Sequence, residues 1–159
     1  MAETDKFLKE SNAIEGVYDT DSFVQASLAW SVLASSPYLT TTDILDAHRT
    51  LMQHHDLAAS EKGHWRKCRI FVGQHEGIAY TKVPSAMLSW VKKVNLSIQR
   101  YHKDDWKELH VAFEGIHPFV DGNGRIGRML MNWHRLKCGL PILVIEAGKR
   151  GEYYQWFRV

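Results

Sequence analysis

The stretch from His117 to Arg128 reads HPFVDGNGRIGR and holds a histidine, an aspartate, an asparagine, two arginines and three glycines. Its Asp-Gly and Asn-Gly pairs favour β-hairpin turns, which need alternating strands on both sides. Both flanks instead repeat apolar residues at helical spacing. The stretch is therefore predicted to be a glycine-rich link between two helices.

Such a link is typical of an anion-binding site. Glycines allow successive N–H groups to point inward at the positive end of the following helix. Arg125 and Arg128 are three residues apart, so both are expected to reach the same anion. Asp121 offers an oxygen ligand suited to Mg²⁺, and His117 has the ordinary pKa range of a general base. The residues together predict a phosphate-transfer site.

Helical periodicity also governs the rest of the chain. Helices are predicted over Thr4 to Glu15, over Ser22 to Ser35, from the Thr40 cap cluster through Met52, from Pro84 through Ile98, from an Asp105–Glu108 capping box through Ile116, and along a buried stripe of Ile126, Leu130, Trp133 and Leu136. Residues Arg69 to Val83 carry β-type residues around His75-Glu76-Gly77, which predicts a hairpin. The expected fold class is all-α with one small β-hairpin.

The composition is that of an ordinary globular protein. A length of 159 residues fits one domain, and the chain is 45% hydrophobic and 24% charged. A net charge of +2 does not suggest nucleic-acid binding. The basic cluster of Arg66, Lys67 and Arg69 is interpreted as a solvated face.

The cysteines and the N-terminus indicate a cytoplasmic protein. Cys68 and Cys138 are single and far apart, which suits a reducing cytosol. The charged N-terminus lacks the apolar segment of a secretory signal, and the longest apolar run, Leu140 to Ile145, is too short to span a bilayer. The nine histidines show no zinc-binding spacing. No membrane or nucleic-acid partner is expected.

The stretch HPFVDGNGRIGR resembles the signature of Fic domains, HxFx(D/E)GNGRxxR, with every specified position occupied. The resemblance extends over nearly the whole chain, so residues 1–159 are expected to form a single Fic domain. It implies a Fic-type helical bundle with a β-hairpin flap, and transfer of AMP from ATP to a hydroxyl of a target protein. The GNGR form favours nucleotidyl transfer over phosphorylation.

The resemblance also implies residue roles. His117 would deprotonate the target hydroxyl, Asp121 would hold Mg²⁺, and Phe119 would anchor the loop in the core. The nucleotide would be bound by Gly122, Asn123, Gly124, Arg125, Arg128 and Tyr154. Tyr154 and its neighbour Tyr153 could equally belong to an aromatic core. The hairpin Arg69 to Val83 would be a flap that holds the target by main-chain pairing.

A second stretch, SNAIEG, covers Ser11 to Gly16. Glu15 is expected in the last turn of its helix, where a negative charge opposes the helix dipole, although a solvated glutamate there is common. Ser11 and Glu15 are four residues apart and share a face. The spacing resembles the Fic inhibitory motif (S/T)xxxE(G/N), which implies that Glu15 pairs with Arg128 at the γ-phosphate position. An inhibitory helix is therefore predicted at about 4–15.

Three functions remain open at this point. The leading one is an auto-inhibited protein adenylyltransferase that acts on a Ser, Thr or Tyr hydroxyl. The same residues would also serve removal of AMP from a modified protein, with Glu15 positioning the attacking water. The third is a nucleotide sensor without turnover. The sequence determines neither the target, nor the donor nucleotide with certainty, nor the oligomeric state.

Overall fold

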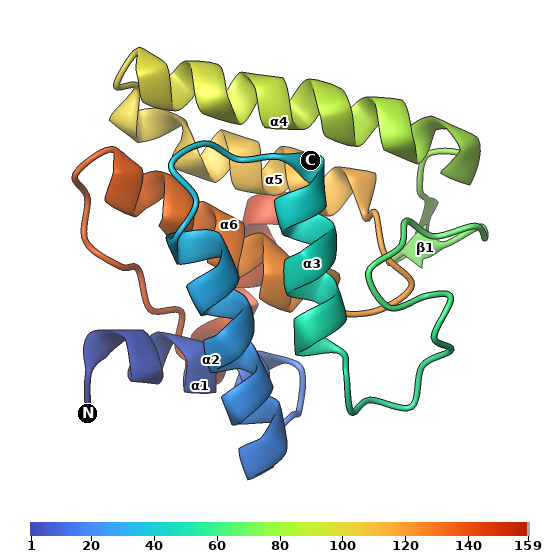
Figure 1. The fold of residues 1–159 in the computed structure, drawn as a ribbon, viewed down its shortest axis with the longest axis horizontal. Helices are drawn as coiled ribbons and strands as arrows, with labels where there is room; N and C mark the ends of the chain where they lie inside the picture. The colour runs from blue at the N-terminus through green and yellow to red at the C-terminus, as the bar shows by residue number, and fades with distance from the viewer. Residues whose placement is uncertain (159) are drawn as a thin grey trace.

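The computed structural model describes residues 1–158, most of which are helical (Figure 1). The α-helices are α1 (Glu3–Ile14), α2 (Thr20–Ala34), α3 (Thr41–Leu51), α4 (Val83–Gln99), α5 (Trp106–Ile116), α6 (Asn123–Lys137) and α7 (Arg150–Tyr154). Short 3₁₀ helices are η1 (Tyr80–Lys82), η2 (Lys103–Asp105), η3 (Ala147–Lys149) and η4 (Gln155–Phe157). The predicted all-α fold class is confirmed.

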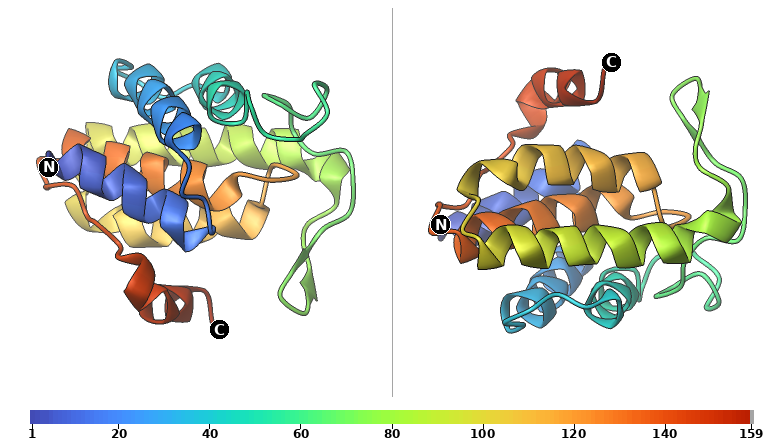
Figure 2. Two further views of the ribbon diagram at one scale, coloured as in Figure 1. Left: turned by 90° about the horizontal axis from the view of Figure 1, so that it is seen from below. Right: turned by 90° about the horizontal axis from the view of Figure 1, so that it is seen from above.

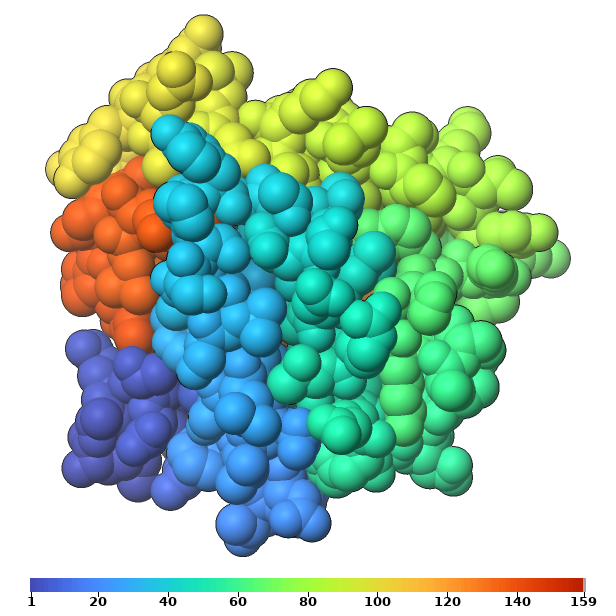
Figure 3. All heavy atoms as spheres, viewed as in Figure 1, coloured from blue at the N-terminus to red at the C-terminus, as the bar shows by residue number. Residues whose placement is uncertain are grey.

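Helix α6 lies at the centre of the structure and contacts α1, α2, α3, α4 and α5. Its side chains Ile126, Leu130 and Trp133 are buried, as the apolar spacing predicts. Leu136 is 44% exposed, so the predicted stripe is wrong at its end. Helices α2 and α3 cover the front of the molecule in this view, and they hide most of α6 (Figure 3). Within residues 1–158, no helix combines the length and apolar content needed to cross a membrane.

The helix starts follow local sequence in one case and not in another. Thr40 caps α3 in a full capping box with Asp43, in agreement with the predicted cap cluster. The predicted capping box of Asp105 and Glu108 is wrong. The Asp105 carboxylate accepts a hydrogen bond from Ser97 Oγ at 2.8 Å and makes no cap bond to α5. A tertiary contact has replaced the local one.

The predicted hairpin is present, with strands β1 (Phe71–Val72) and β2 (His75–Glu76) in antiparallel register. Its turn lies at Gly73, whose φ is +62°, and not at residues 75–77 as predicted. Glycine adopts this left-handed conformation without steric cost. Val83 belongs to α4 and is buried, so the hairpin covers fewer residues than the predicted range of Arg69 to Val83. The hairpin and α7 project from the same side of the helical body (Figure 2).

Candidate active site

The loop between α5 and α6 begins at His117, which adopts the left-handed conformation with φ 50° and ψ 64°. This conformation is uncommon for a residue with a side chain. The His117 carbonyl oxygen accepts a hydrogen bond from Arg66 Nε at 2.7 Å. Arg66 is 2% exposed, so the prediction of a solvated face is wrong for this residue. Its charge is buried because carbonyl groups from distant segments converge on it.

The side chain of Asn123 holds the loop in shape. Its Oδ1 accepts from the Phe119 N–H and its Nδ2 donates to the Phe119 carbonyl, both at 2.8 Å. Phe119 is fully buried, as expected for an anchor, and stacks on His48 with a centroid distance of 3.7 Å. The Asn123 amide is therefore used within the loop, which leaves its backbone N–H as the group that can meet a ligand.

His48 reinforces the loop from α3, a role that its position in the sequence does not indicate. Its Nε2 lies 2.8 Å from the Asp121 carbonyl oxygen, and its Nδ1 accepts from the Gly63 N–H at 2.9 Å. The neutral ring with its proton on Nε2 satisfies both contacts. Burial lowers the pKa of His48 to about 4, with the Asp121 carbonyl opposing part of the shift.

Acid is therefore expected to destabilise the fold through His48. The unfolded chain takes up the proton near the ordinary pKa of 6.5, while the folded chain takes it up only near about 4. Stability is thus full above pH 6.5 and falls between these two values, by about 1.4 kcal/mol per pH unit and on the order of 3 kcal/mol in all. Urea unfolding across this range should give a shallower pH slope for His48→Gln than for wild type. The exposed control His75→Gln should keep the wild-type slope, and equal slopes for all three proteins would contradict the assignment.

The N-terminus of α6 presents a surface of backbone N–H groups. The first helical hydrogen bond runs from the Ile126 N–H to the Gly122 carbonyl, and the Gly122 N–H donates to Asp121 Oδ1 at 2.7 Å. The Gly122 N–H is thus already used, contrary to its predicted role. Among residues 1–158, the N–H groups of Asn123, Gly124 and Arg125 have no hydrogen-bond partner. Three free donors at a positive helix end suit a phosphate group.

Arg128 connects this surface to α1. The buried guanidinium donates to Ser11 Oγ at 2.8 Å, to the Ser11 carbonyl at 2.9 Å and to Glu15 Oε1 at 2.7 Å. The negative C-terminal end of α1 favours a cation at this position. The helix ends at Ile14, and Gly16 follows with φ +73°. The Glu15 carboxylate lies so close to Gly124 that a side chain there would overlap it. Glu15 therefore occupies space beside the free N–H groups of α6.

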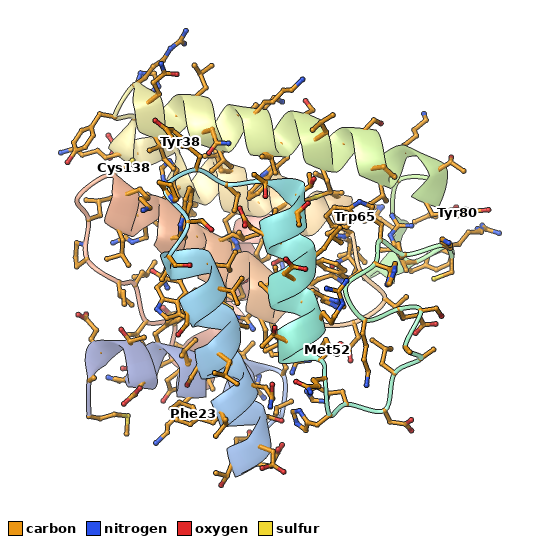
Figure 4. All side chains as sticks on the ribbon, viewed as in Figure 1. Phe23, Tyr38, Met52, Trp65, Tyr80 and Cys138 are labelled. Atoms are coloured by element: carbon orange, nitrogen blue, oxygen red, sulfur yellow. The ribbon has the colours of Figure 1, made fainter. Side chains whose placement is uncertain are left out.

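Arg125 faces different neighbours. Its Nη1 lies 3.0 Å from His55 Nε2, and its Nη2 lies 3.6 Å from the sulfur of Met52, at the end of α3 (Figure 4). Its contact with Asp121 is longer, at 3.9 Å. Arg125 thus bonds the segment after α3 while Arg128 bonds α1, so the two guanidinium groups have different partners in this arrangement. Their joint binding of one anion stays a prediction.

Asp121 presents its carboxylate to solvent, with a side-chain exposure of 64%. Only Oδ1 is used, by the Gly122 N–H. Within residues 1–158, no group of three or more His, Cys, Asp or Glu side chains could enclose a metal ion. One exposed carboxylate beside the N-terminus of α6 is compatible with Mg²⁺, which is commonly held by one or two carboxylates together with substrate phosphates.

His117 is half-buried at the start of this loop. Its Nδ1 is buried and has no hydrogen-bond partner among residues 1–158. Burial lowers the pKa of His117, and the Glu114 carbonyl opposes part of that shift. The imidazole is therefore neutral at neutral pH and able to accept a proton.

A cavity of about 770 Å³ opens beside His117. It is bounded by the flap at Val72 and Gly73, by α5 at Val111 and Glu114, by α6 at Gly124 and Arg128, and by the C-terminal segment at Tyr153, Tyr154 and Phe157. A smaller cavity of about 150 Å³ adjoins the loop and also contains Glu15 and His117. Tyr154 is half exposed and lines the larger cavity.

Three side chains beside Arg128 have contacts that the sequence did not predict, namely Tyr153, His110 and Glu114. Tyr153 is buried, and its hydroxyl lies 3.4 Å from Arg128 Nη1 and 2.8 Å from His110 Nε2. His110 Nδ1 in turn lies 3.1 Å from the Gly127 carbonyl. Glu114 packs against Gly127, and its Oε1 has no hydrogen-bond partner within residues 1–158. Burial raises the pKa of Glu114 to about 8, while Arg128 opposes the shift. No local pattern marks these contacts, because they join residues far apart in the chain.

Gly124 at the N-terminus of α6, His117 and the buried Arg128 together line the larger cavity of this helical domain. Comparison with known proteins identifies its kind. A model of the Fic/DOC family matches residues 38–134, more than half of the chain. The chain therefore belongs to the Fic/DOC family.

Relatives and solved structures agree with this placement. Proteins named protein adenylyltransferase Fic from Drosophila erecta and Nematostella vectensis are each 31% identical over 161 residues. The alignments cover 100% and 98% of this chain but 31% and 36% of those proteins, so the chain spans about a third of their length. A Fic domain containing signaling protein from Bacteroides thetaiotaomicron superposes with a TM-score of 0.81 at 20% identity, over 95% of this chain and 69% of that one. Fic-1 from C. elegans gives 0.73 at 22% identity, over 98% and 55%. These two likenesses show the shared fold.

Proposed function

We propose that this chain transfers AMP from ATP to a Ser, Thr or Tyr hydroxyl of a target protein, and that α1 holds it in an inhibited state. The observation that carries the proposal is the 2.7 Å pair of Arg128 and Glu15, packed against Gly124 beside the neutral His117. The names of the relatives, protein adenylyltransferase Fic, support the transfer reaction.

The residues of the loop suit each part of this reaction. His117 would take the proton of the target hydroxyl as its oxygen attacks the α-phosphorus of ATP. The bond from that phosphorus to the oxygen bridging the β-phosphate then breaks, and pyrophosphate leaves. The free N–H groups of Asn123 and Gly124 would donate to phosphate oxygens, where charge develops. Arg128, once released from Glu15, would bind the γ-phosphate and thereby align the reacting atoms.

Mg²⁺ is the metal that we assign to this reaction, with Asp121 as its protein ligand. The ion would neutralise phosphate charge when bound together with ATP. Asp121 is suited to this role because its carboxylate is exposed next to the N-terminus of α6.

Asp121→Ala is expected to raise the Mg²⁺ concentration needed for half-maximal transfer by roughly tenfold or more, equivalent to about 1.4 kcal/mol. The reason is the loss of a direct carboxylate ligand. The measurement is the rate of self-modification against Mg²⁺ concentration, in a Glu15→Gly background. Partial recovery at high Mg²⁺ supports the assignment. A lower plateau at an unchanged midpoint would show that Asp121 acts otherwise.

The flap, predicted at Arg69 to Val83, is proposed to hold the target segment. Both of its strands are exposed, and its tip reaches the large cavity through Val72 and Gly73. A two-stranded hairpin with a free edge can pair with an extended peptide through main-chain hydrogen bonds. A target bound in this way would carry its hydroxyl toward His117.

The chain is further proposed to work in the cytoplasm. Cys68 is exposed and Cys138 is buried, and neither forms a disulfide. Exposed free thiols persist in reducing compartments.

Intact-mass measurement tests the proposed transfer. The Glu15→Gly protein is incubated with Mg²⁺ and, in separate reactions, with ATP and other nucleoside triphosphates. The expected result is an added AMP on the protein itself or on added lysate proteins, with ATP as donor. Absence of any adduct on any protein would refute the proposal, and an adduct of different mass would change the group assigned.

Removal of AMP is a second candidate, because Glu15 lines both cavities together with His117. In that reaction Glu15 would position a water molecule for attack on the phosphorus. Wild type would then release AMP from a modified protein, and Glu15→Gly would not. Release by both proteins, or by neither, would exclude this function for Glu15.

A further inference from the structure

Arg66 is a buried arginine that meets main-chain carbonyl oxygens. Its Nε donates to His117 O at 2.7 Å, and its Nη2 lies 3.3 Å from Ile116 O. The same guanidinium donates through Nη1 to Cys68 O at 2.9 Å and through Nη2 to Ile78 O at 2.7 Å. The first two oxygens lie at the end of α5, and the other two lie on the two stems of the flap. One side chain therefore joins the catalytic loop to both sides of the flap.

The chemistry of these contacts requires an arginine. The planar guanidinium has five N–H donors in a fixed fork, so it can bond several oxygens at once. Carbonyl groups at the C-terminal end of a helix carry partial negative charge, which favours a cation at this position. A lysine would keep the charge, but its single ammonium group could not reach all four oxygens in the same directions.

Apart from the bonds of Arg66, the flap has few contacts that fix its position. Its strands contain two residues each, all of them exposed. The Gly77 N–H closes its base by donating to the Ile70 carbonyl at 2.9 Å. An isolated two-stranded hairpin is marginally stable in water. On the loop side, the Arg66 N–H also donates to the Pro118 carbonyl at 2.8 Å, and Trp65 packs on Phe119. The segment that carries Arg66 is thus anchored, whereas the flap depends on it.

We propose that Arg66 is a positioning residue that holds the flap in register with His117, so that a target segment on the flap presents its hydroxyl to the imidazole. The inference rests on the proposed transfer function. Arg66 lines neither the large cavity nor the small one, so nucleotide binding does not depend on it.

The test compares Arg66→Lys with the parent in a Glu15→Gly background. The acceptor is the tagged His117→Ala chain at varied concentration, which separates kcat from KM for the acceptor. Arg49→Lys is the matched control, since Arg49 is an exposed arginine of α3, outside the flap and the loop, whose Nη1 bonds Asp46 at 2.8 Å. The Kd for ATP and the thermal unfolding temperature are measured for every variant.

Arg66→Lys is expected to lower kcat by roughly 10²-fold, because a displacement of about 1 Å can cost that much. The Kd for ATP should stay within about twofold, and Arg49→Lys should behave as the parent. Unchanged kcat in a folded Arg66→Lys protein would overturn the proposal. An equal loss of ATP affinity would also overturn it, because the loop itself would then have collapsed.

Amide hydrogen exchange on the wild-type protein tests the link without any variant or any activity. If Arg66 ties the flap to the loop, the Gly77 and Arg66 amides open together and show the same protection. Opening of Gly77 alone would overturn the proposal, even if Arg66→Lys and Arg66→Gln both fail to fold. If Glu15→Gly transfers no AMP but the Gly77 and Arg66 amides show equal protection, the transfer function is refuted. The contact that ties the flap to the loop would still stand.

Discussion

Replacement of His117 by alanine is expected to slow AMP transfer by about 10²- to 10⁴-fold while the affinity for ATP stays within about twofold. The imidazole lines the small cavity beside the N-terminus of α6, so its loss removes the proposed proton acceptor and leaves the N–H groups of α6 in place. The measurement is the initial rate of labelling from ATP in a Glu15→Gly background, with ATP affinity determined by calorimetry.

The left-handed backbone at His117 calls for a second variant. Alanine at φ 50° is strained, and a slow reaction could then reflect a distorted loop. Asparagine tolerates this conformation and does not act as a base near neutral pH. His117→Asn should therefore be as slow as His117→Ala and should unfold at the wild-type temperature. A joint loss of ATP binding and transfer in both variants would mean that His117 is structural.

Replacement of Glu15 by glycine is expected to raise transfer by roughly 5- to 150-fold, which corresponds to an inhibitory coupling of about 1–3 kcal/mol. Glu15 occupies one edge of the Arg128 guanidinium and the space against Gly124. Its removal leaves Arg128 free to bind the γ-phosphate. Removing one partner of a buried pair commonly costs about 3–5 kcal/mol. The cost here should be smaller, because Arg128 keeps its hydrogen bonds to Ser11 and the Glu15 side chain is 36% exposed.

Three further variants distinguish release of inhibition from damage to the ATP-binding site. Glu15→Gln keeps a group that can accept from Arg128 without its charge, so its rate should lie between wild type and Glu15→Gly. Arg128→Ala should remain slow, since it removes a phosphate ligand together with the pair, and the double variant should be equally slow. The rates are compared at saturating ATP and Mg²⁺. If Glu15→Gly is no faster than wild type on any acceptor, the 2.7 Å pair is a structural contact of α1 and the inhibition is refuted.

The local features of this protein could be derived from its sequence. The stretch HPFVDGNGRIGR carries the resemblance to Fic domains, because a motif of consecutive residues can be read without knowing the fold, and the family model confirmed it. The helices follow from apolar spacing, and the cap at Thr40 follows from a partner three residues away. Ser11 and Glu15 share a face because residues four apart in a helix are neighbours, and the structure places both on Arg128.

Only the tertiary structure decided how the polar groups are paired across the chain. Arg66 looks like a surface residue in the sequence, because burying a charge is costly unless many acceptors surround it. Its acceptors include carbonyls 50 and 51 residues away, whose convergence no local pattern encodes. Asp105 likewise bonds Ser97 in place of the cap it could have formed, and Arg125 contacts His55, 70 residues away. Each of these side chains has several possible partners. The packing of the helices decides which distant segment lies beside it and therefore which partner it bonds.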